Sequence, residues 1–151
     1  MNTNEIETVL YGDCGEYFQE VYSMDTLPVE PSLLVCNTDP STKPGQHWIA
    51  IYVDKNRCGE YFDSFGRAPN KHFTDYLNEH CRTWTFNKKQ LQSITSSFCG
   101  YYCCIYCMHR CRGINMKTIV NLFTTDTAFN DSIVYGFIRN KSWKKSILFY
   151  Q

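Results

Sequence analysis

Three residues that lie far apart in the chain, Cys99, His47 and Asp63, carry the side chains that thiol catalysis requires. Cys99 stands where a Ser-rich segment meets an apolar run that we interpret as a buried helix over 99–110. A cysteine at a helix N-terminus feels the positive end of the helix dipole, which lowers the thiol pKa from about 8.5 toward the neutral range. Gly100 follows it and has no Cβ, so a substrate could approach the thiol closely. Cys99 is therefore a candidate nucleophile.

His47 and Asp63 supply the base and the orienting acid that such a nucleophile needs. His47 begins a run rich in β-forming residues, 47–53, which predicts a buried strand. An imidazole fixed there could pair with a thiolate and later protonate a leaving amine. Asp63 lies on the next predicted strand, 59–65, which would form a hairpin with the first, and its carboxylate could bond one ring nitrogen. Spacing alone does not decide whether these three residues form a catalytic site, because a buried structural cysteine and a hydrogen-bonded histidine give the same pattern.

The elements around these residues alternate between helical and extended patterns. We predict a short helix that starts with a capping box at Asn4 and Glu7 and ends before Gly12. Further helices are predicted over 70–80, 99–110, 116–123 and 126–138, and strands over 32–37, 47–53, 59–65 and 83–86. This order is typical of an α+β domain in which helices flank a small, mostly antiparallel sheet, and residues 1–151 fit one such domain.

Composition excludes several classes of protein. Aromatic residues make up 16% of the chain and charged residues 20%, which is not the composition of a disordered tail. The 15 basic residues equal the 15 acidic ones, so a strong positive field for gripping nucleic acid is absent. No apolar run approaches the roughly 20 residues of a membrane helix. Residues 1–8 are polar and acidic rather than an apolar secretion signal, so we expect an intracellular protein with no membrane span.

The nine cysteines raise the alternative of a metal site. Cys99, Cys103, Cys107 and Cys111 recur at every fourth position. On a helix this spacing separates neighbours by about 6 Å along the axis and the outer pair by about 18 Å. Four sulfurs that bind one zinc ion at about 2.3 Å cannot be spread so far apart. We therefore expect no metal and interpret Cys103, Cys107 and Cys111 as small side chains packed against the sheet.

Several longer segments resemble adenain, the maturation protease of adenoviruses. They are HWIAIY at 47–52, YFDSFG at 61–66, and Gln92 followed after six residues by CGYYCC at 99–104. The segment DCGEYF at 13–18 is similar to the opening Cys-Gly-x-Tyr-Phe of that family, and 115–123 is similar to the stretch after its catalytic helix. Together the similar segments reach from about residue 10 to residue 137.

The resemblance implies a papain-like, adenain-like fold, with the segments of papain in a rearranged order. It also implies a catalytic triad of His47, Asp63 and Cys99, with Gln92 in the oxyanion hole. The Gln92 amide and the backbone N–H of Cys99 would both donate hydrogen bonds to the oxygen of the tetrahedral intermediate.

The acid of the triad departs from the adenoviral pattern. Adenoviral members carry Glu at this position, whereas the related SUMO-protease branch carries Asp, and the pair Asp63–Ser64 resembles that branch. Glu60 is near in sequence, but on a strand it would point to the opposite face from Asp63. We therefore expect Asp63 to be the acid.

The resemblance further implies a cysteine endopeptidase that cleaves viral capsid and other precursor proteins after small residues such as glycine, through a thioester acyl-enzyme. A close alternative is a protease that removes a ubiquitin-like or SUMO-like modifier, whose substrate is a folded protein rather than a flexible peptide. An acyltransferase of the related His–acid–Cys effector group would need an acyl-CoA site, and no basic pocket for one is evident. A non-catalytic structural or DNA-binding chain would leave the order of the four residues unexplained.

Partners and location also follow from the resemblance. Proteases of adenovirus-like viruses, virophages and large self-synthesising transposons share this pattern, so we expect a monomer that acts on viral structural precursors in the host nucleus or viral factory and in the virion. The family uses an activating viral peptide, bound through a disulfide, and DNA. Cys81 stands at the matching distance before Gln92 and Cys99 and is the candidate attachment point; the alternative is a half-buried thiol at a helix end. The zero net charge argues against a role for DNA.

Overall fold

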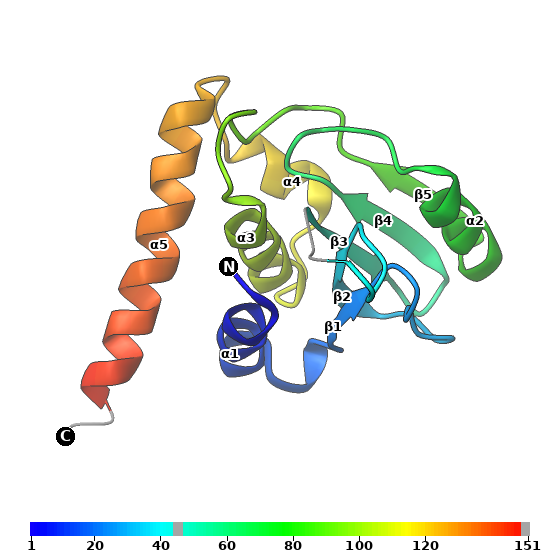
Figure 1. Cartoon of the computed structure of the whole chain (residues 1–151), viewed down its shortest axis with the longest axis horizontal. Coiled ribbons are helices and arrows are strands. Elements are labelled where there is room, and N and C mark those ends of the chain that lie inside the picture. Colours follow the sequence, from blue (N-terminus) through cyan, green and yellow to red (C-terminus); the bar gives the residue numbers. More distant parts are fainter. Residues whose placement is uncertain (44–46, 149–151) are drawn as a thin grey trace.

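The computed structural model describes residues 1–43 and 47–148, with side chains up to residue 140. Its described strands form one sheet in the order β1–β2–β3–β4–β5 (Figure 1). The strands are β1 (Val21–Ser23), β2 (Leu33–Asn37), β3 (Trp48–Val53), β4 (Cys58–Phe62) and β5 (Thr83–Phe86). The helices are α1 (Thr3–Cys14), the short 3₁₀ helix η1 (Gly15–Tyr17), α2 (Lys71–His80), α3 (Cys99–Arg110), α4 (Met116–Asn121) and α5 (Thr127–Leu148). The predicted α+β class is confirmed, and β5 and α3 have the predicted bounds.

The sheet is mixed rather than mostly antiparallel, which corrects the prediction. β2 pairs antiparallel with β3, and β3 with β4, but the described edge strands β1 and β5 each run parallel to their neighbour. β5 is parallel to β4 because α2 lies between them in sequence and carries the chain back to the same end of the sheet. β1 has three partly buried residues, too few to give the period-2 pattern that reveals a strand.

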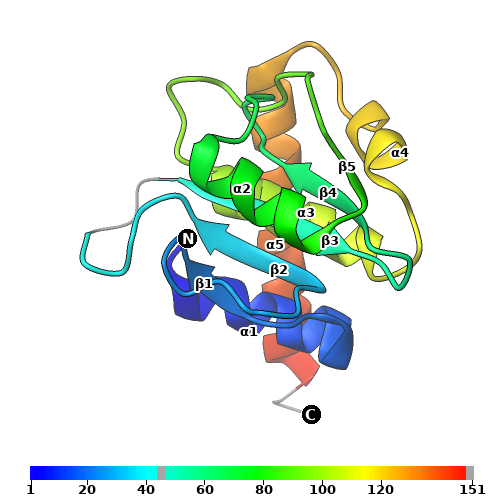
Figure 2. The same cartoon turned by 90° about the vertical axis from the view of Figure 1, so that its right-hand side faces the viewer.

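Helices cover both faces of the sheet, with α2 on one face and α3 on the other (Figure 2). Leu33 and Val35 of β2 belong to the core cluster on the α3 side, whereas Leu34 and Cys36 belong to the cluster on the α2 side. Because both faces are buried, β2 is a continuous apolar run from Leu33 to Cys36, without polar alternation. α3 lies between the sheet on one side and α1 and α5 on the other, so it is held on several sides (Figure 1).

α1 starts and ends at positions other than those predicted. Its capping box joins Asn2 and Glu5: the Glu5 N–H donates to Asn2 Oδ1 (2.9 Å) and the Asn2 N–H donates to Glu5 Oε2 (2.8 Å). The helix continues through Gly12 to Cys14, because its buried face packs on α3 and outweighs the low helix propensity of glycine. Among the described residues, no helix combines the length and apolar character that a membrane crossing requires.

A charged cluster ties α3 to the sheet. Glu60 of β4 accepts a hydrogen bond from the Tyr106 hydroxyl (2.6 Å) and another from the backbone N–H of Met116 (3.3 Å). Arg110 Nε lies 3.1 Å from Glu60 Oε1, as a charge contact rather than an aligned hydrogen bond. The carboxylate therefore faces α3 and α4, on the opposite side of the strand from Asp63, as strand alternation predicts.

Removal of the Glu60 carboxylate should lower stability without touching the cleft residues. In Glu60→Ala the partly buried Arg110 loses its partner charge, and a broken buried pair costs about 3–5 kcal/mol, so we expect the free energy of unfolding to fall by about 3 kcal/mol. Urea unfolding followed by tryptophan fluorescence measures the change. The control is Lys71→Ala, which breaks an exposed pair with Asp75 (2.7 Å) and should change stability very little. Equally small losses in both variants would contradict the role of Glu60 in the core.

Candidate active site

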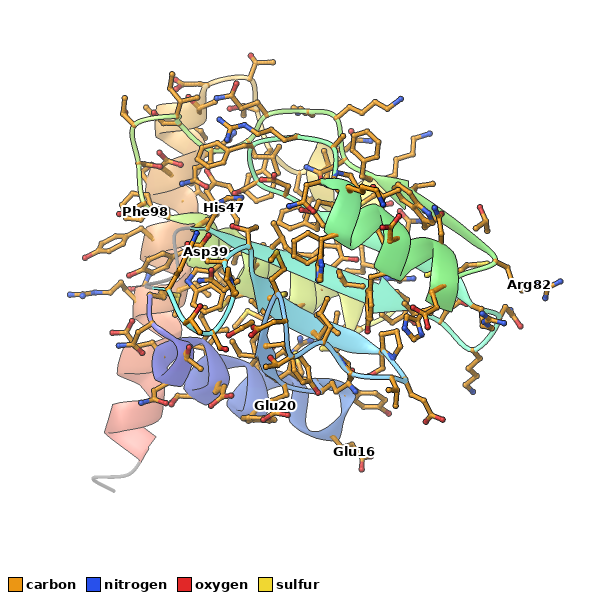
Figure 3. All side chains as sticks on the ribbon, turned by 45° about the vertical axis from the view of Figure 1, so that its right-hand side comes forward. Glu16, Glu20, Asp39, His47, Arg82 and Phe98 are labelled. Carbon is orange, nitrogen blue, oxygen red and sulfur yellow. The ribbon has the colours of Figure 1, made fainter. Side chains whose placement is uncertain are left out.

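The four residues predicted to carry chemistry come together at one cleft, although each belongs to a different segment. His47 immediately precedes β3, Asp63 directly follows β4, Gln92 lies in the connection from β5 to α3, and Cys99 is the first residue of α3. All four line a surface cleft of about 640 Å³. In Figure 3, His47 lies at the end of the sheet near Phe98, the residue that precedes Cys99.

A short hydrogen bond joins His47 to Asp63. The distance from His47 Nε2 to Asp63 Oδ1 is 2.8 Å, and since an ionised carboxylate can only accept, Nε2 carries the proton. The same Oδ1 accepts the backbone N–H of Phe65 (2.8 Å), and the Phe65 ring stacks on the imidazole with 4.9 Å between the ring centroids. Asp63 is only 4% exposed, so water has little access to the bond. This arrangement leaves His47 Nδ1 for Cys99.

Hydrogen bonds and charges shift the two reacting groups in opposite directions. Burial by itself lowers the pKa of His47, but the hydrogen bonds to Asp63 and Cys99 outweigh burial and raise the pKa to about 9. Burial by itself raises the pKa of Cys99, but hydrogen bonds from His47 and from the backbone N–H groups of Trp48 and Gly100, together with the charge of His47, lower it on balance. Both shifts favour a thiolate paired with an imidazolium over the neutral pair.

The first turn of α3 and its neighbours shape the surroundings of the thiol. No side chain caps this helix, so its first backbone N–H groups are available to Cys99. A Cβ at Gly100 would lie 3.1 Å from Met1 Cβ and 3.4 Å from Trp48 Cδ1, so a larger residue here would have to push these side chains apart by a few tenths of an ångström. Trp48 lines the cleft and donates from Nε1 to the Met1 carbonyl (3.0 Å).

Gln92 is fully buried, and its side chain borders the cleft. Its Nε2 donates to the carbonyl oxygen of Ser96 (3.0 Å), and its backbone N–H donates to the carbonyl oxygen of Ser64 (3.1 Å). The segment that carries Gln92 is thus fixed to the end of β4, beside Asp63. The Gln92 amide and the Cys99 backbone N–H are donors that could hold an oxyanion next to the thiol.

Asn87 supports Asp63, and the sequence did not single it out. Its Oδ1 accepts the backbone N–H of Asp63 (2.9 Å), and its Nδ2 donates to the Asp63 carbonyl (2.6 Å). Both backbone groups of the acid are therefore held by one buried side chain. The one sequence signal is a polar residue directly after the predicted strand 83–86. Its importance becomes visible only through the parallel pairing that sets the end of β5 beside the end of β4.

Cys81 lies outside the cleft. It follows α2 as its C-cap, is 7% exposed, and burial raises the pKa of its thiol. Its sulfur packs against β4 so closely that a Cβ at Gly59 would lie only 2.5 Å from it. A disulfide to a partner peptide requires an accessible thiolate, so this environment gives no support to the attachment role inferred from spacing.

The other cysteines of α3 serve as core residues. Cys103 and Cys107 are fully buried in the cluster between α3 and the sheet, which confirms the packing interpretation for both. Cys111, just beyond the helix, is partly buried and packs at the edge of the same cluster.

One group of candidate metal ligands lies within the described part of the chain. Asp13, Cys14 and Cys111 have ligand atoms within 4.8 Å of one another. A guanidinium nitrogen of Arg112 lies 2.7 Å from Asp13 Oδ2 and 3.6 Å from the Cys111 sulfur. A cation of the protein itself therefore already compensates this group, and we assign no metal to it.

Comparison with known sequences shows viral cysteine proteases as relatives, although no protein-family model matches the chain. A protein of Acanthamoeba polyphaga mimivirus that is named as a thiol protease is 28% identical over 98 residues, which are 58% of this chain and 32% of that protein. A cysteine protease of African swine fever virus is 55% identical over 38 residues, which are 23% of this chain and 14% of that protein. The matched parts thus span about a third or less of these relatives.

Solved structures share the fold. The crystal structure of the African swine fever virus pS273R protease matches 88% of this chain and 65% of its own chain, with a TM-score of 0.62 at 17% identity. The central domain of the uncharacterized protein Lpg1148 of Legionella pneumophila matches 95% of this chain and 96% of its own, with a TM-score of 0.59 at 13% identity. The predicted papain-like, adenain-like cysteine protease fold is thereby confirmed, whereas the narrower resemblance to adenain itself stays a prediction.

Cys99 should react as a thiolate at a lower pH than an ordinary thiol, because its pKa is lowered. We expect its rate of alkylation by iodoacetamide, measured by peptide mass spectrometry, to fall only as the pH drops through the lowered pKa of Cys99. In His47→Ala the thiol loses the partner that lowers its pKa, so the rate should rise only near the ordinary value of about 8.5. The exposed Cys58 is the internal control in every sample. A Cys99 profile that follows that of Cys58 in the unchanged protein would contradict the ion pair.

Proposed function

We propose that this chain is a cysteine endopeptidase in which Cys99 is the nucleophile, His47 the base and acid, and Asp63 the residue that orients His47. The observation that carries the proposal is the 2.8 Å hydrogen bond between Asp63 and His47 at the wall of a cleft that the Cys99 thiol also lines, where His47 lowers the pKa of that thiol. Such a buried pair costs desolvation, and an arrangement that places it at the wall of a cleft is typical of catalytic sites. The similarity to viral cysteine proteases supports the same reaction class.

In the proposed first half-reaction the Cys99 thiolate attacks the carbonyl carbon of the peptide. A carbon–sulfur bond forms, and the carbonyl π electrons move onto the oxygen to give a tetrahedral oxyanion. When the carbon–nitrogen bond breaks, the His47 imidazolium gives its proton to the leaving amine, which leaves a thioester on Cys99. Asp63 holds Nε2 throughout, so that Nδ1 stays directed at the sulfur and at the leaving group.

The second half-reaction reverses these roles. Neutral His47 takes a proton from water while the water oxygen attacks the thioester carbon. The second tetrahedral intermediate collapses with release of the Cys99 thiolate and a carboxylic acid product, and the thiolate–imidazolium pair is restored. In both halves the Gln92 amide and the Cys99 backbone N–H are proposed to donate to the oxyanion.

The proposed substrates are viral structural precursors cut after small residues such as glycine. Support comes from the viral origin of the relatives and from a cleft that is open at the surface and walled by Trp48. The alternative is removal of a ubiquitin-like or SUMO-like modifier. It is favoured by a second African swine fever virus relative, 55% identical over 38 residues, which is named as a SUMO-1 cysteine protease.

The setting of the reaction completes the proposal. The enzyme would act as a monomer in the host nucleus or viral factory and in the virion. An activating viral peptide remains part of the proposal, with its attachment point open because Cys81 is buried. DNA is the less favoured cofactor, since the net charge of the chain is zero.

Loss of the Gln92 amide should slow peptide cleavage and spare the thiolate. With a fluorogenic peptide that has glycine before the scissile bond, Gln92→Ala should lower kcat by about 10²–10³, the usual effect of removing one oxyanion donor. The Cys99 alkylation rate should stay unchanged, because alkylation builds no oxyanion. Cys99→Ala is the blank for cleavage, and Lys71→Ala is the matched surface control. Equal losses of cleavage and alkylation in Gln92→Ala would contradict the oxyanion role.

The two substrate classes can be separated with one sequence in two contexts. We expect similar kcat/KM for a glycine-containing peptide alone and for the same sequence as the tail of a folded SUMO-like domain. An endopeptidase would recognise only the peptide segment that lies in its cleft, so the folded domain should add nothing. A large gain in kcat/KM that depends on the folded domain would instead favour the deconjugating protease.

A further inference from the structure

Asp63 and Ser64 follow β4 directly, and their side chains contact the two parts of the proposed active site, the triad and the oxyanion hole. Asp63 bonds His47, whereas the Ser64 hydroxyl donates to Gln92 Oε1 at 2.6 Å. Ser64 and Gln92 are both fully buried, so water does not compete for either side chain. Two consecutive residues thus connect the triad to the candidate oxyanion hole.

The two ends of the Gln92 amide have nearly the same shape, but only Nε2 can donate to an oxyanion. One end faces the carbonyl oxygen of Ser96 at 3.0 Å, and a carbonyl only accepts, so this end must be Nε2. The other end is then Oε1, and it needs a donor. Among the described residues the donor is the Ser64 hydroxyl.

The second hydrogen of Nε2 has a weaker partner. Ser96 Oγ lies 3.1 Å from Nε2, and this hydroxyl itself donates to the Ser93 carbonyl (3.1 Å). A negatively charged oxygen is a stronger acceptor than a neutral hydroxyl, so an oxyanion in the cleft could replace Ser96 Oγ. The amide is therefore held at both ends and still has one hydrogen to give.

Ser64 also anchors the main chain that carries Gln92. Its carbonyl oxygen accepts the backbone N–H groups of Leu91 (2.9 Å) and Gln92 (3.1 Å). Asn87 holds the preceding residue, Asp63, through both of its backbone groups. The serine hydroxyl thus projects from a fixed backbone, and its reach to Gln92 Oε1 does not depend on a mobile loop.

We propose that Ser64 is a positioning residue that sets the orientation of the Gln92 side-chain amide and keeps Nε2 as the end available to the oxyanion. This assignment rests on the proposed cysteine protease function. Without the hydroxyl, Oε1 is buried with no donor, and the amide must rotate or shift to find one. The backbone hydrogen bonds of Ser64 do not involve the hydroxyl and are unaffected by its removal.

The kinetic test uses Ser64→Ala, Ser64→Thr and Gln92→Ala, with Ser132→Ala on the exposed face of α5 as the matched serine control. Ser64→Ala should lower kcat for the glycine peptide by about tenfold or more, within the roughly 10²–10³ lost with a whole oxyanion donor, and leave KM and the pH profile of Cys99 alkylation unchanged. Ser64→Thr keeps the hydroxyl and should recover most of the rate.

In the Gln92→Ala background, Ser64→Ala should have no further effect. The same fold-loss in both backgrounds would overturn the proposal, because Ser64 would then act other than through Gln92.

A second measurement reads the contact itself, independent of turnover. In ¹⁵N-labelled protein the Gln92 side-chain amide protons should exchange slowly with solvent, and in Ser64→Ala they should exchange faster while the backbone amide of Gln92 stays protected. Unchanged side-chain exchange in Ser64→Ala would overturn the proposal. If the contact behaves as expected but the unchanged protein shows neither fast Cys99 alkylation nor Cys99-dependent cleavage, the proposed protease function fails and the catalytic role of Ser64 fails with it.

Discussion

The hydrogen bond between His47 and Asp63 is the interaction on which the rest of the candidate site depends. It assigns the ring proton to Nε2, contributes to the raised pKa of His47, and through the protonated ring lowers the pKa of Cys99. The bond forms where two strands meet at one end of the sheet. β3 and β4 run antiparallel, so the residue just before β3 and the residue just after β4 emerge at the same end of the sheet.

Burial disfavours the charged forms of both His47 and Cys99, because it lowers the pKa of His47 and raises that of Cys99. Fixed hydrogen bonds overcome the effect, and they can be fixed because α3 is held on several sides by the sheet, α1 and α5. The same dry surroundings strengthen the contacts of Asn87 with Asp63 and of Ser64 with Gln92. The polar network of the site therefore depends on the apolar core, which fixes its hydrogen bonds and keeps water away from them.

Two solved structures share the fold of this chain. The likeness to the African swine fever virus protease covers 88% of this chain but 65% of that one, and the Legionella domain matches over nearly its whole length at 13% identity. Such low identity shows a common fold, and a fold by itself does not define a reaction. The chemistry proposed for this chain rests instead on the four cleft residues and on the contacts that hold them.

Local patterns in the sequence determined the class of the domain and the bounds of β5 and α3, because helix and strand periodicity acts over short range. The four residues that meet at the cleft were identified through the resemblance to adenain, since their types and spacing alone left the set open. The tertiary structure decided those features that depend on which strands become neighbours. The parallel edge strands, the clamp of Asn87 on Asp63 and the hydroxyl of Ser64 on Gln92 all arise from contacts between distant segments. The continuation of α1 past Gly12 and the burial of Cys81 were likewise settled by packing against α3 and β4. The number of residues between two hydrogen-bonded partners in distant segments is not fixed, so these partners could be identified only from the fold.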